Sequence, residues 1–109
     1  MDSYDVVITQ RAQEQLGAYI RYILLTLMNE QAARSVWQDA LLTGQQLSSA
    51  AGSLPFCRHP ALKERGYRSI SFRRHQYIMI YHIRGNIAYV DAVYHQLQDY
   101  ENAFAEDLV

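Results

Sequence analysis

The hydrophobic period of the chain changes from about 3.6 to 2 residues at Gly66, and no other feature of the sequence constrains the fold as strongly. Before Gly66, apolar residues recur at three- and four-residue steps, which is typical of amphipathic helices. After it, YRSISF alternates apolar with small polar residues, and YIMIYHI is apolar on both faces, as a central strand is. Helices first and a run of strands afterwards predict an α+β domain rather than a doubly wound fold.

The helical half predicts one strand followed by two paired helices. YDVVIT, residues 4–9, is short and rich in β-branched residues, as a buried strand is. Residues 10–28 carry apolar side chains at helical spacing, and Thr9 is placed to cap the first turn. Asn29 interrupts this pattern and can cap a second helix, whose apolar stripe extends over residues 30–47. The two helices are predicted to pair as a hairpin.

The second half predicts three strands and a short helix. Residues 48–66 hold both prolines of the chain and end the helices. Strands are predicted at 67–72, 77–83 and 87–94, joined by tight connections into an antiparallel meander. Apolar residues four apart from Tyr100 onward suggest a short closing helix.

The predicted fold is therefore α+β, with an N-terminal strand, a two-helix hairpin, a three-stranded antiparallel meander packed on the hairpin and a short C-terminal helix. The length of 109 residues predicts one domain over residues 1–109. Helices before the strands can cover one face of the sheet, and what covers the other face is left open by the sequence.

Composition and cysteine content exclude several classes of protein. Half of the residues are apolar and 19% are charged, which is ordinary globular composition. Cys57 is the only cysteine, so no internal disulfide can form, and no apolar run approaches the roughly 18 residues of a membrane span. Met1 to Asp5 lacks the basic start of a signal peptide, so we expect a cytoplasmic protein. No His or Cys spacing predicts a metal, and we expect no cofactor.

The net charge of −1 hides an uneven distribution along the chain. Residues 1–50 hold three basic and five acidic residues, residues 51–95 hold seven and two, and residues 96–109 hold four acids and no base. A basic middle segment can meet phosphates or an acidic partner, and it can equally be a solvated surface.

Several short motifs, in this order and spacing, resemble the RelE/ParE superfamily of toxins from bacterial type II toxin–antitoxin modules. The most specific are Gly66-Tyr67-Arg68, Tyr77 to Ile83, Val93-Tyr94-His95 and Asp99-Tyr100-Glu101. The resemblance covers essentially the whole chain, and the long hairpin is more similar to the ParE branch, linked to plasmid stabilisation, than to the RelE-like ribonucleases.

The resemblance implies a toxin that a cognate antitoxin protein neutralises. ParE-like members poison DNA gyrase by binding, whereas RelE-like members cleave mRNA on the ribosome. The fold does not choose between these activities. We expect a ParE-like gyrase inhibitor, with a RelE-like endoribonuclease and a toxin remnant of reduced activity as alternatives.

Three residues are candidates for metal-free RNA cleavage, which needs a proton acceptor and cations around the phosphate. By the resemblance, Arg68 and His95 occupy positions that RelE-like ribonucleases use. Strand alternation places Arg73 on the sheet face away from the hairpin and Arg68 on the hairpin side, which argues against Arg68 as a catalyst.

The segment after His95 departs from the family pattern. Many members have arginines there, and this chain has Gln96, Leu97 and Gln98 before an acidic tail. The missing cations weaken the ribonuclease hypothesis and leave antitoxin binding untouched.

Tyrosines of the predicted meander suggest a partner surface. Tyr77, Met79 and Tyr81 lie on one face of the central strand, and one helical layer cannot cover both faces of the sheet. We predict that the antitoxin covers this face and also meets Tyr89 and Tyr94, with the C-terminal helix or a second copy in a homodimer as the alternative cover.

Overall fold

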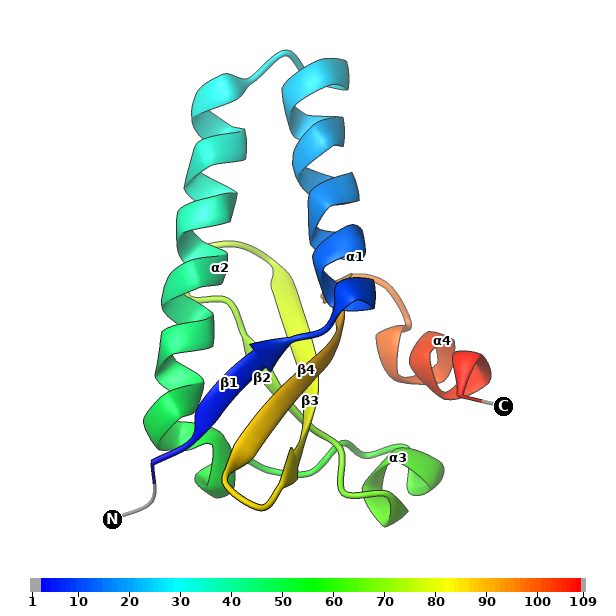
Figure 1. Cartoon of the computed structure of the whole chain (residues 1–109). Coiled ribbons are helices and arrows are strands. Elements are labelled where there is room, and N and C mark those ends of the chain that lie inside the picture. Colours follow the sequence, from blue (N-terminus) through cyan, green and yellow to red (C-terminus); the bar gives the residue numbers. More distant parts are fainter. Residues whose placement is uncertain (1–2, 109) are drawn as a thin grey trace.

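The computed structural model describes residues 3–108, and Figure 1 shows how their helices and strands are arranged. In chain order the elements are β1 (Asp5–Ile8), α1 (Gln10–Arg21), a π-helical turn (Tyr22–Thr26), α2 (Glu30–Ala50), a 3₁₀ turn (Ala51–Ser53), α3 (Pro60–Glu64), β2 (Arg68–Ser71), β3 (Tyr77–Arg84), β4 (Ile87–His95) and α4 (Tyr100–Asp107). The predicted order of elements and the α+β class are confirmed.

The four strands form one sheet in the order β1-β4-β3-β2. β2, β3 and β4 pair antiparallel as the predicted meander, and β1 pairs parallel with β4. The pairing of β3 with β4 changes register between Ile80 and Tyr81, which face Ala92 and Val90. Asp91 is therefore the extra residue of a β-bulge, and the bulge changes which sheet face the residues of β4 occupy.

Both predicted helix caps are present. The Thr9 side chain accepts a hydrogen bond from the Ala12 N–H at 3.3 Å, and Asn29 Oδ1 accepts one from the Ala32 N–H at 2.9 Å. Between the helices, Met28 has φ +54°, a left-handed conformation that reverses the chain there. The caps and this turn fix where each helix of the hairpin begins.

The predicted apolar stripe of the first helix is not buried along its whole length. Beyond Arg21 the helix loosens into the π-helical turn, and the hairpin extends past the sheet that it covers (Figure 1). Leu27 and Met28 are 56% and 81% exposed, so this end of the stripe lacks a packing partner within residues 3–108. Amphipathic spacing predicts which face of a helix is apolar, but it does not predict how far along the helix the sheet extends to cover that face.

Two apolar cores lie on opposite faces of the sheet. The core on the hairpin side joins α1 and α2 to side chains that include Ile70, Met79, Tyr81 and Val93. The core on the other side joins Ile78, Ile80, Ala92 and Tyr94 to Leu62 of α3 and Phe104 of α4. The second face of the sheet, which the sequence left open, is thus covered by α3 and α4. No helix in the described part of the chain is long and apolar enough to cross a membrane.

Candidate functional site

Arg68, the first residue of β2, is bound to its own chain. Its guanidinium donates a hydrogen bond to the Leu54 carbonyl oxygen and lies over the Phe56 ring, with Cζ 4.0 Å from the ring centroid. Arg68 pairs with Tyr81, whose side chain belongs to the core on the hairpin side. Directly paired residues share a sheet face, so Arg68 lies on the hairpin side as predicted.

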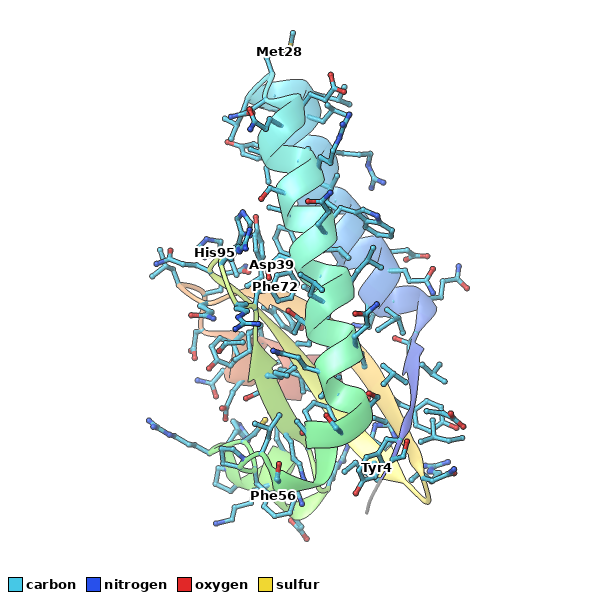
Figure 2. All side chains as sticks on the ribbon, turned by 90° about the vertical axis from the view of Figure 1, so that its left-hand side faces the viewer. Tyr4, Met28, Asp39, Phe56, Phe72 and His95 are labelled. Carbon is cyan, nitrogen blue, oxygen red and sulfur yellow. The ribbon has the colours of Figure 1, made fainter. Side chains whose placement is uncertain are left out.

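The three predicted catalytic residues do not come together. His95 pairs with Tyr77 and Arg68 pairs with Tyr81, four residues further along β3. This offset separates Arg68 from His95 by about 13 Å along the strand direction alone. Figure 2 shows that Phe56, which lies under the Arg68 guanidinium in the loop before α3, is well separated from His95 at the end of β4. With its guanidinium held by Leu54 and Phe56, Arg68 does not converge with His95 on one site.

Arg73 lies outside the strand from which its orientation was predicted. β2 ends at Ser71, so Arg73 belongs to the connection between β2 and β3 and the period-two count no longer applies to it. This connection is held against α2 by Asp39, which lies near Phe72 in Figure 2. The orientation of the Arg73 side chain therefore stays a prediction, and its basis in strand alternation is lost.

Asp39 fixes this connection by accepting four hydrogen bonds. Its carboxylate oxygens lie 3.2, 2.9 and 2.9 Å from the backbone nitrogens of Arg73, Arg74 and His75, and 2.7 Å from His75 Nδ1. Burial alone raises the pKa of Asp39, but hydrogen bonds from His75 and the backbone outweigh it and hold the pKa below its usual value. Asp39 thus positions the two arginine backbones.

Asp39 was missed by sequence reasoning, although a signal exists. It lies between Val36 and Ala40 in the apolar stripe of α2, and only 2% of its surface is exposed. A carboxylate at a core position needs hydrogen-bond donors, and a neighbouring loop can supply them from its backbone.

His95 is arranged as a structural histidine. Its Nδ1 accepts a hydrogen bond from the Leu97 N–H at 3.2 Å, and its ring packs edge-on against Tyr77 with centroids 5.2 Å apart. A neutral imidazole that accepts at Nδ1 carries its proton on Nε2. In this arrangement neither ring nitrogen of neutral His95 is free to accept a substrate proton.

Residues 96–98, where the resemblance led us to expect arginines, bind the chain itself. Gln96 Nε2 donates to the Tyr77 carbonyl oxygen at 3.1 Å. Gln98 Oε1 accepts from the His95 N–H at 3.0 Å and from the Tyr19 hydroxyl at 2.9 Å. Leu97, between them, is 80% exposed. The segment ties the β4–α4 connection to β3 and α1, and it adds no positive charge.

A polar groove of about 800 Å³ lies on the α4 side of the sheet, between the loop before α3, β2 and the start of α4. Ser69 and Ser71 of β2 line this groove. A ribonuclease site would need positively charged side chains at such positions to stabilise the phosphate in the transition state. Arg58 contributes a positive charge and Asp99 and Glu101 contribute negative ones, and Glu101 accepts a hydrogen bond from the His59 N–H at 2.7 Å. This charge balance suits a polyanion poorly.

The predicted aromatic partner surface is largely internal. Met79 and Tyr81 are 1% and 0% exposed, and the Tyr81 hydroxyl donates to the Ala51 carbonyl oxygen at 2.6 Å. Burial raises the pKa of Tyr81 to about 12. Tyr94 is also buried, on the opposite face beneath α4. A partner cannot reach these three side chains without opening a core, so the hairpin and α4 are their cover.

An apolar hollow between the two long helices offers a more accessible surface. We call it the interhelix groove, and its apolar lining includes Ile8, Leu16, Gly17, Trp37, Ala40 and Leu41. Its volume is about 300 Å³, and it shares Ile8, Ala40 and Leu41 with a second hollow of about 410 Å³ between β1 and α2. Trp37 and Leu41 are each about half exposed at its rim. An unfilled apolar groove of this kind suits an apolar segment of a partner protein.

Within residues 3–108, no group of three or more His, Cys, Asp or Glu side chains is placed to hold a metal ion. Cys57 is buried, and burial raises the pKa of its thiol to about 12. The thiolate form is therefore scarce at neutral pH, and Cys57 is unsuited to nucleophilic chemistry.

Two solved structures share this fold. One, described as the chromosomal ParDE TA system from P. aeruginosa, has a TM-score of 0.65 and 18% identity, covering 84% of this chain and 94% of that chain. The other, the toxin–antitoxin complex RelBE2 from Mycobacterium tuberculosis, has a TM-score of 0.60 and 19% identity, covering 90% and 97%. No protein-family model and no curated protein sequence matches the chain. The fold expected from the sequence resemblance is thereby confirmed.

Proposed function

We propose that the chain is the toxin of a type II toxin–antitoxin module and that it inhibits DNA gyrase by binding, as ParE-like toxins do. The observation that carries this proposal is the dispersal of the groups that RNA cleavage would need. Arg68 is bound at one end of the sheet, and His95 is held by its own chain at the other. A protein that acts by binding needs no such assembled site.

The similarity to the ParDE and RelBE2 structures supports an antitoxin as the partner of this chain. We place an apolar antitoxin segment in the interhelix groove, where Trp37 and Leu41 can close over it. Tyr77 and Tyr89, which are only partly buried, stay in the proposed antitoxin contact. Because DNA gyrase, the ribosome and the antitoxin are all cytoplasmic, we propose that this chain acts in the cytoplasm. The homodimer stays a prediction.

One observation favours a RelE-like endoribonuclease as the second candidate. Phe72 pairs through its N–H with the Tyr77 carbonyl oxygen, and Tyr77 pairs with His95, so Arg73 and His95 lie at the same end of the sheet. A substrate phosphate at this end could contact Arg73 if the His95 hydrogen bonds changed.

A toxin remnant is the third candidate. Gln96 and Gln98 favour it, because they form hydrogen bonds within the chain and provide no positive charge for a target.

Induction of the intact chain in a bacterial host separates these candidates when DNA supercoiling and translated mRNA are followed together. We expect supercoiling defects and a DNA-damage response while messages stay intact. Rapid cleavage of translated messages without DNA damage would sink the gyrase proposal. Normal growth with folded protein present would identify a remnant.

The position of the antitoxin has a matched test within α2. Leu41 lines the interhelix groove and Leu42, its neighbour, does not, yet their exposures are 49% and 50%. We expect Leu41→Glu to abolish neutralisation by the antitoxin encoded beside the toxin, because a charge cannot enter an apolar contact. Leu42→Glu is expected to leave neutralisation intact. Equal effects of the two substitutions would remove the groove from the proposal.

A further inference from the structure

A histidine–aspartate pair on the α4 side of the sheet has no part in the function proposed above. His82 of β3 and Asp91 of β4 lie close to the β3–β4 turn, at the end of the sheet remote from the hairpin tip (Figure 1). His82 Nδ1 is 2.5 Å from Asp91 Oδ2, and the two side chains are 22% and 21% exposed. Asp91 lies two residues after Tyr89, the direct partner of His82, so strand alternation puts Asp91 on the same sheet face as His82.

Two tyrosines hold the His82 ring in one orientation. The Tyr89 ring is stacked on it with centroids 5.2 Å apart and an interplanar angle of 16°. The Tyr67 ring meets it edge-on at 5.4 Å and 71°. With the Asp91 carboxylate accepting from Nδ1, the remaining polar atom of the ring is Nε2, which has no hydrogen-bond partner within residues 3–108.

The pair is not an efficient device for stability. Burial raises the pKa of Asp91, although the hydrogen bond with His82 acts to lower it. A buried ionisable pair commonly stabilises a protein no better than apolar side chains of similar volume. A fixed imidazole with one free nitrogen, at a site that solvent still reaches, is instead the arrangement of a ligand-binding histidine.

Two arginines without ion-pair partners stand beside this pair. Arg84 follows His82 by two residues on β3, so it emerges on the same face about 7 Å away. Arg65 precedes Gly66 and Tyr67. Tyr67 packs edge-on against the His82 ring, so Arg65, two residues before Tyr67, is close to the pair along the chain. Burial and the charge of Asp91 raise the pKa of Tyr67, and the positive charges of Arg65, Arg11 and Arg84 act against that rise.

The charges around His82 leave a positive excess. Within residues 3–108, neither Arg65 nor Arg84 has a carboxylate within ion-pair distance, whereas the nearby Arg11 is paired with Asp107 at 2.5 Å. With His82 protonated, His82, Arg65 and Arg84 are three positive groups on this part of the sheet, beside the single carboxylate of Asp91. A dianion would balance this excess, and guanidinium and imidazolium groups are the usual partners of phosphate oxygens.

We propose that His82, Arg65 and Arg84 form a binding site for a phosphate monoester, such as the terminal phosphate of a nucleotide. The protonated His82 donates from Nε2 to one phosphate oxygen, and the two guanidiniums approach the others. Asp91 and the two tyrosine rings position the imidazole. A phosphodiester carries one charge and a substituent on each side, so it matches this excess less well than a monoester. The site is separate from the interhelix groove and does not depend on the gyrase proposal, and Tyr89 is the one residue that it shares with the proposed antitoxin contact.

The test uses the intact chain and NMR of its histidine rings at about pH 6.5, where free imidazole and phosphate monoesters are both partly ionised. AMP is titrated against the protein, and the dinucleotide ApA, which contains only a phosphodiester, is titrated in parallel. We expect AMP to shift the His82 resonances saturably and with the largest change among the four histidines. ApA is expected to bind at least about tenfold more weakly, having lost one charge-assisted contact.

Paired variants show whether the arginines carry the binding. Arg84→Gln is expected to weaken AMP binding about tenfold, whereas Arg21→Gln, which removes the same charge from the exposed end of α1, leaves it unchanged. Urea unfolding of both variants verifies that they are folded. The proposal is overturned if AMP leaves the His82 resonances unmoved, if ApA binds as tightly as AMP, or if the two variants bind AMP alike.

Discussion

Replacing Asp39 by alanine tests how the chain holds the connection that carries Arg73 and Arg74. The substitution removes the acceptor of three successive backbone N–H groups and the partner of His75. The helix itself tolerates the change, because alanine is the best helix former. Any loss of stability therefore reports on the contact between α2 and the connection.

The hydrogen bonds of Asp39 set the expected magnitude. Each hydrogen bond to a charged group contributes about 1.5 to 3 kcal/mol net, and a buried donor left unsatisfied costs about 1 to 3 kcal/mol. The connection is partly exposed, so water can replace some of these bonds after the substitution. We expect Asp39→Ala to lower the free energy of unfolding by about 3 kcal/mol, at the upper end of ordinary single substitutions.

The assay is urea unfolding of Asp39→Ala and of the unmodified chain, followed by circular dichroism at pH 7 and again near pH 3. The folded-state pKa of Asp39 lies below its unfolded value. Its ionised form therefore stabilises the fold above the ordinary Asp pKa of about 3.9, and this contribution is lost as pH falls through the folded pKa. The difference between the two proteins is expected to shrink at the lower pH.

Two control variants separate the reasons for the loss. Asp39→Asn keeps an amide oxygen as acceptor and removes the charge, so we expect a loss of about 1 to 2 kcal/mol. Asp107→Ala breaks an exposed ion pair with Arg11 and is expected to change stability by less than about 1 kcal/mol. The reasoning is refuted if Asp39→Ala costs no more than Asp107→Ala, or if its effect at pH 7 persists unchanged near pH 3.

Three further predictions address single side chains. Cys57, with its raised pKa of about 12, is expected to resist Ellman's reagent at pH 8 in the folded chain and to react at once in urea; rapid reaction of the folded chain would show that the thiol is accessible. Tyr81→Phe leaves the Ala51 carbonyl oxygen without its donor, so thermal unfolding is expected to show a free energy of unfolding lower by about 1 to 2 kcal/mol. An unchanged free energy of unfolding would show that water replaces the hydroxyl. His95→Ala is expected to leave growth inhibition after induction largely intact, and abolished toxicity in a stably folded variant would return His95 to a catalytic role.

The elements of the fold could be predicted because their signals are local. The caps at Thr9 and Asn29, the glycine turn at residues 84–86 and the alternation along β2 each depend on a few neighbouring residues. Gly85 has φ +62°, as a tight turn between two strands requires. The order of the three meander strands followed from their run after the helices, whereas the parallel pairing of β1 with β4 was not predicted.

The candidate site could not be predicted in the same way, because it depends on register and on long-range contacts. The resemblance suggested that Arg68 and His95 belong to one site. In the structure they pair with residues of β3 that are four positions apart, so they are separated along the sheet. The contact of Asp91 with His82 depends on the register of β4 against β3, which no local pattern in IAYVDAVY predicts. Asp39 was detectable as a carboxylate in an apolar stripe, but its partners lie 34 to 36 residues away.

The central claim is that this chain acts by binding DNA gyrase, and the most direct measurement is gyrase supercoiling of relaxed plasmid in the presence of the purified, folded chain. We predict that supercoiling falls as the chain approaches the gyrase concentration, while the same preparation leaves mRNA intact in a translating extract. Full supercoiling in the presence of a large excess of folded chain would contradict the account.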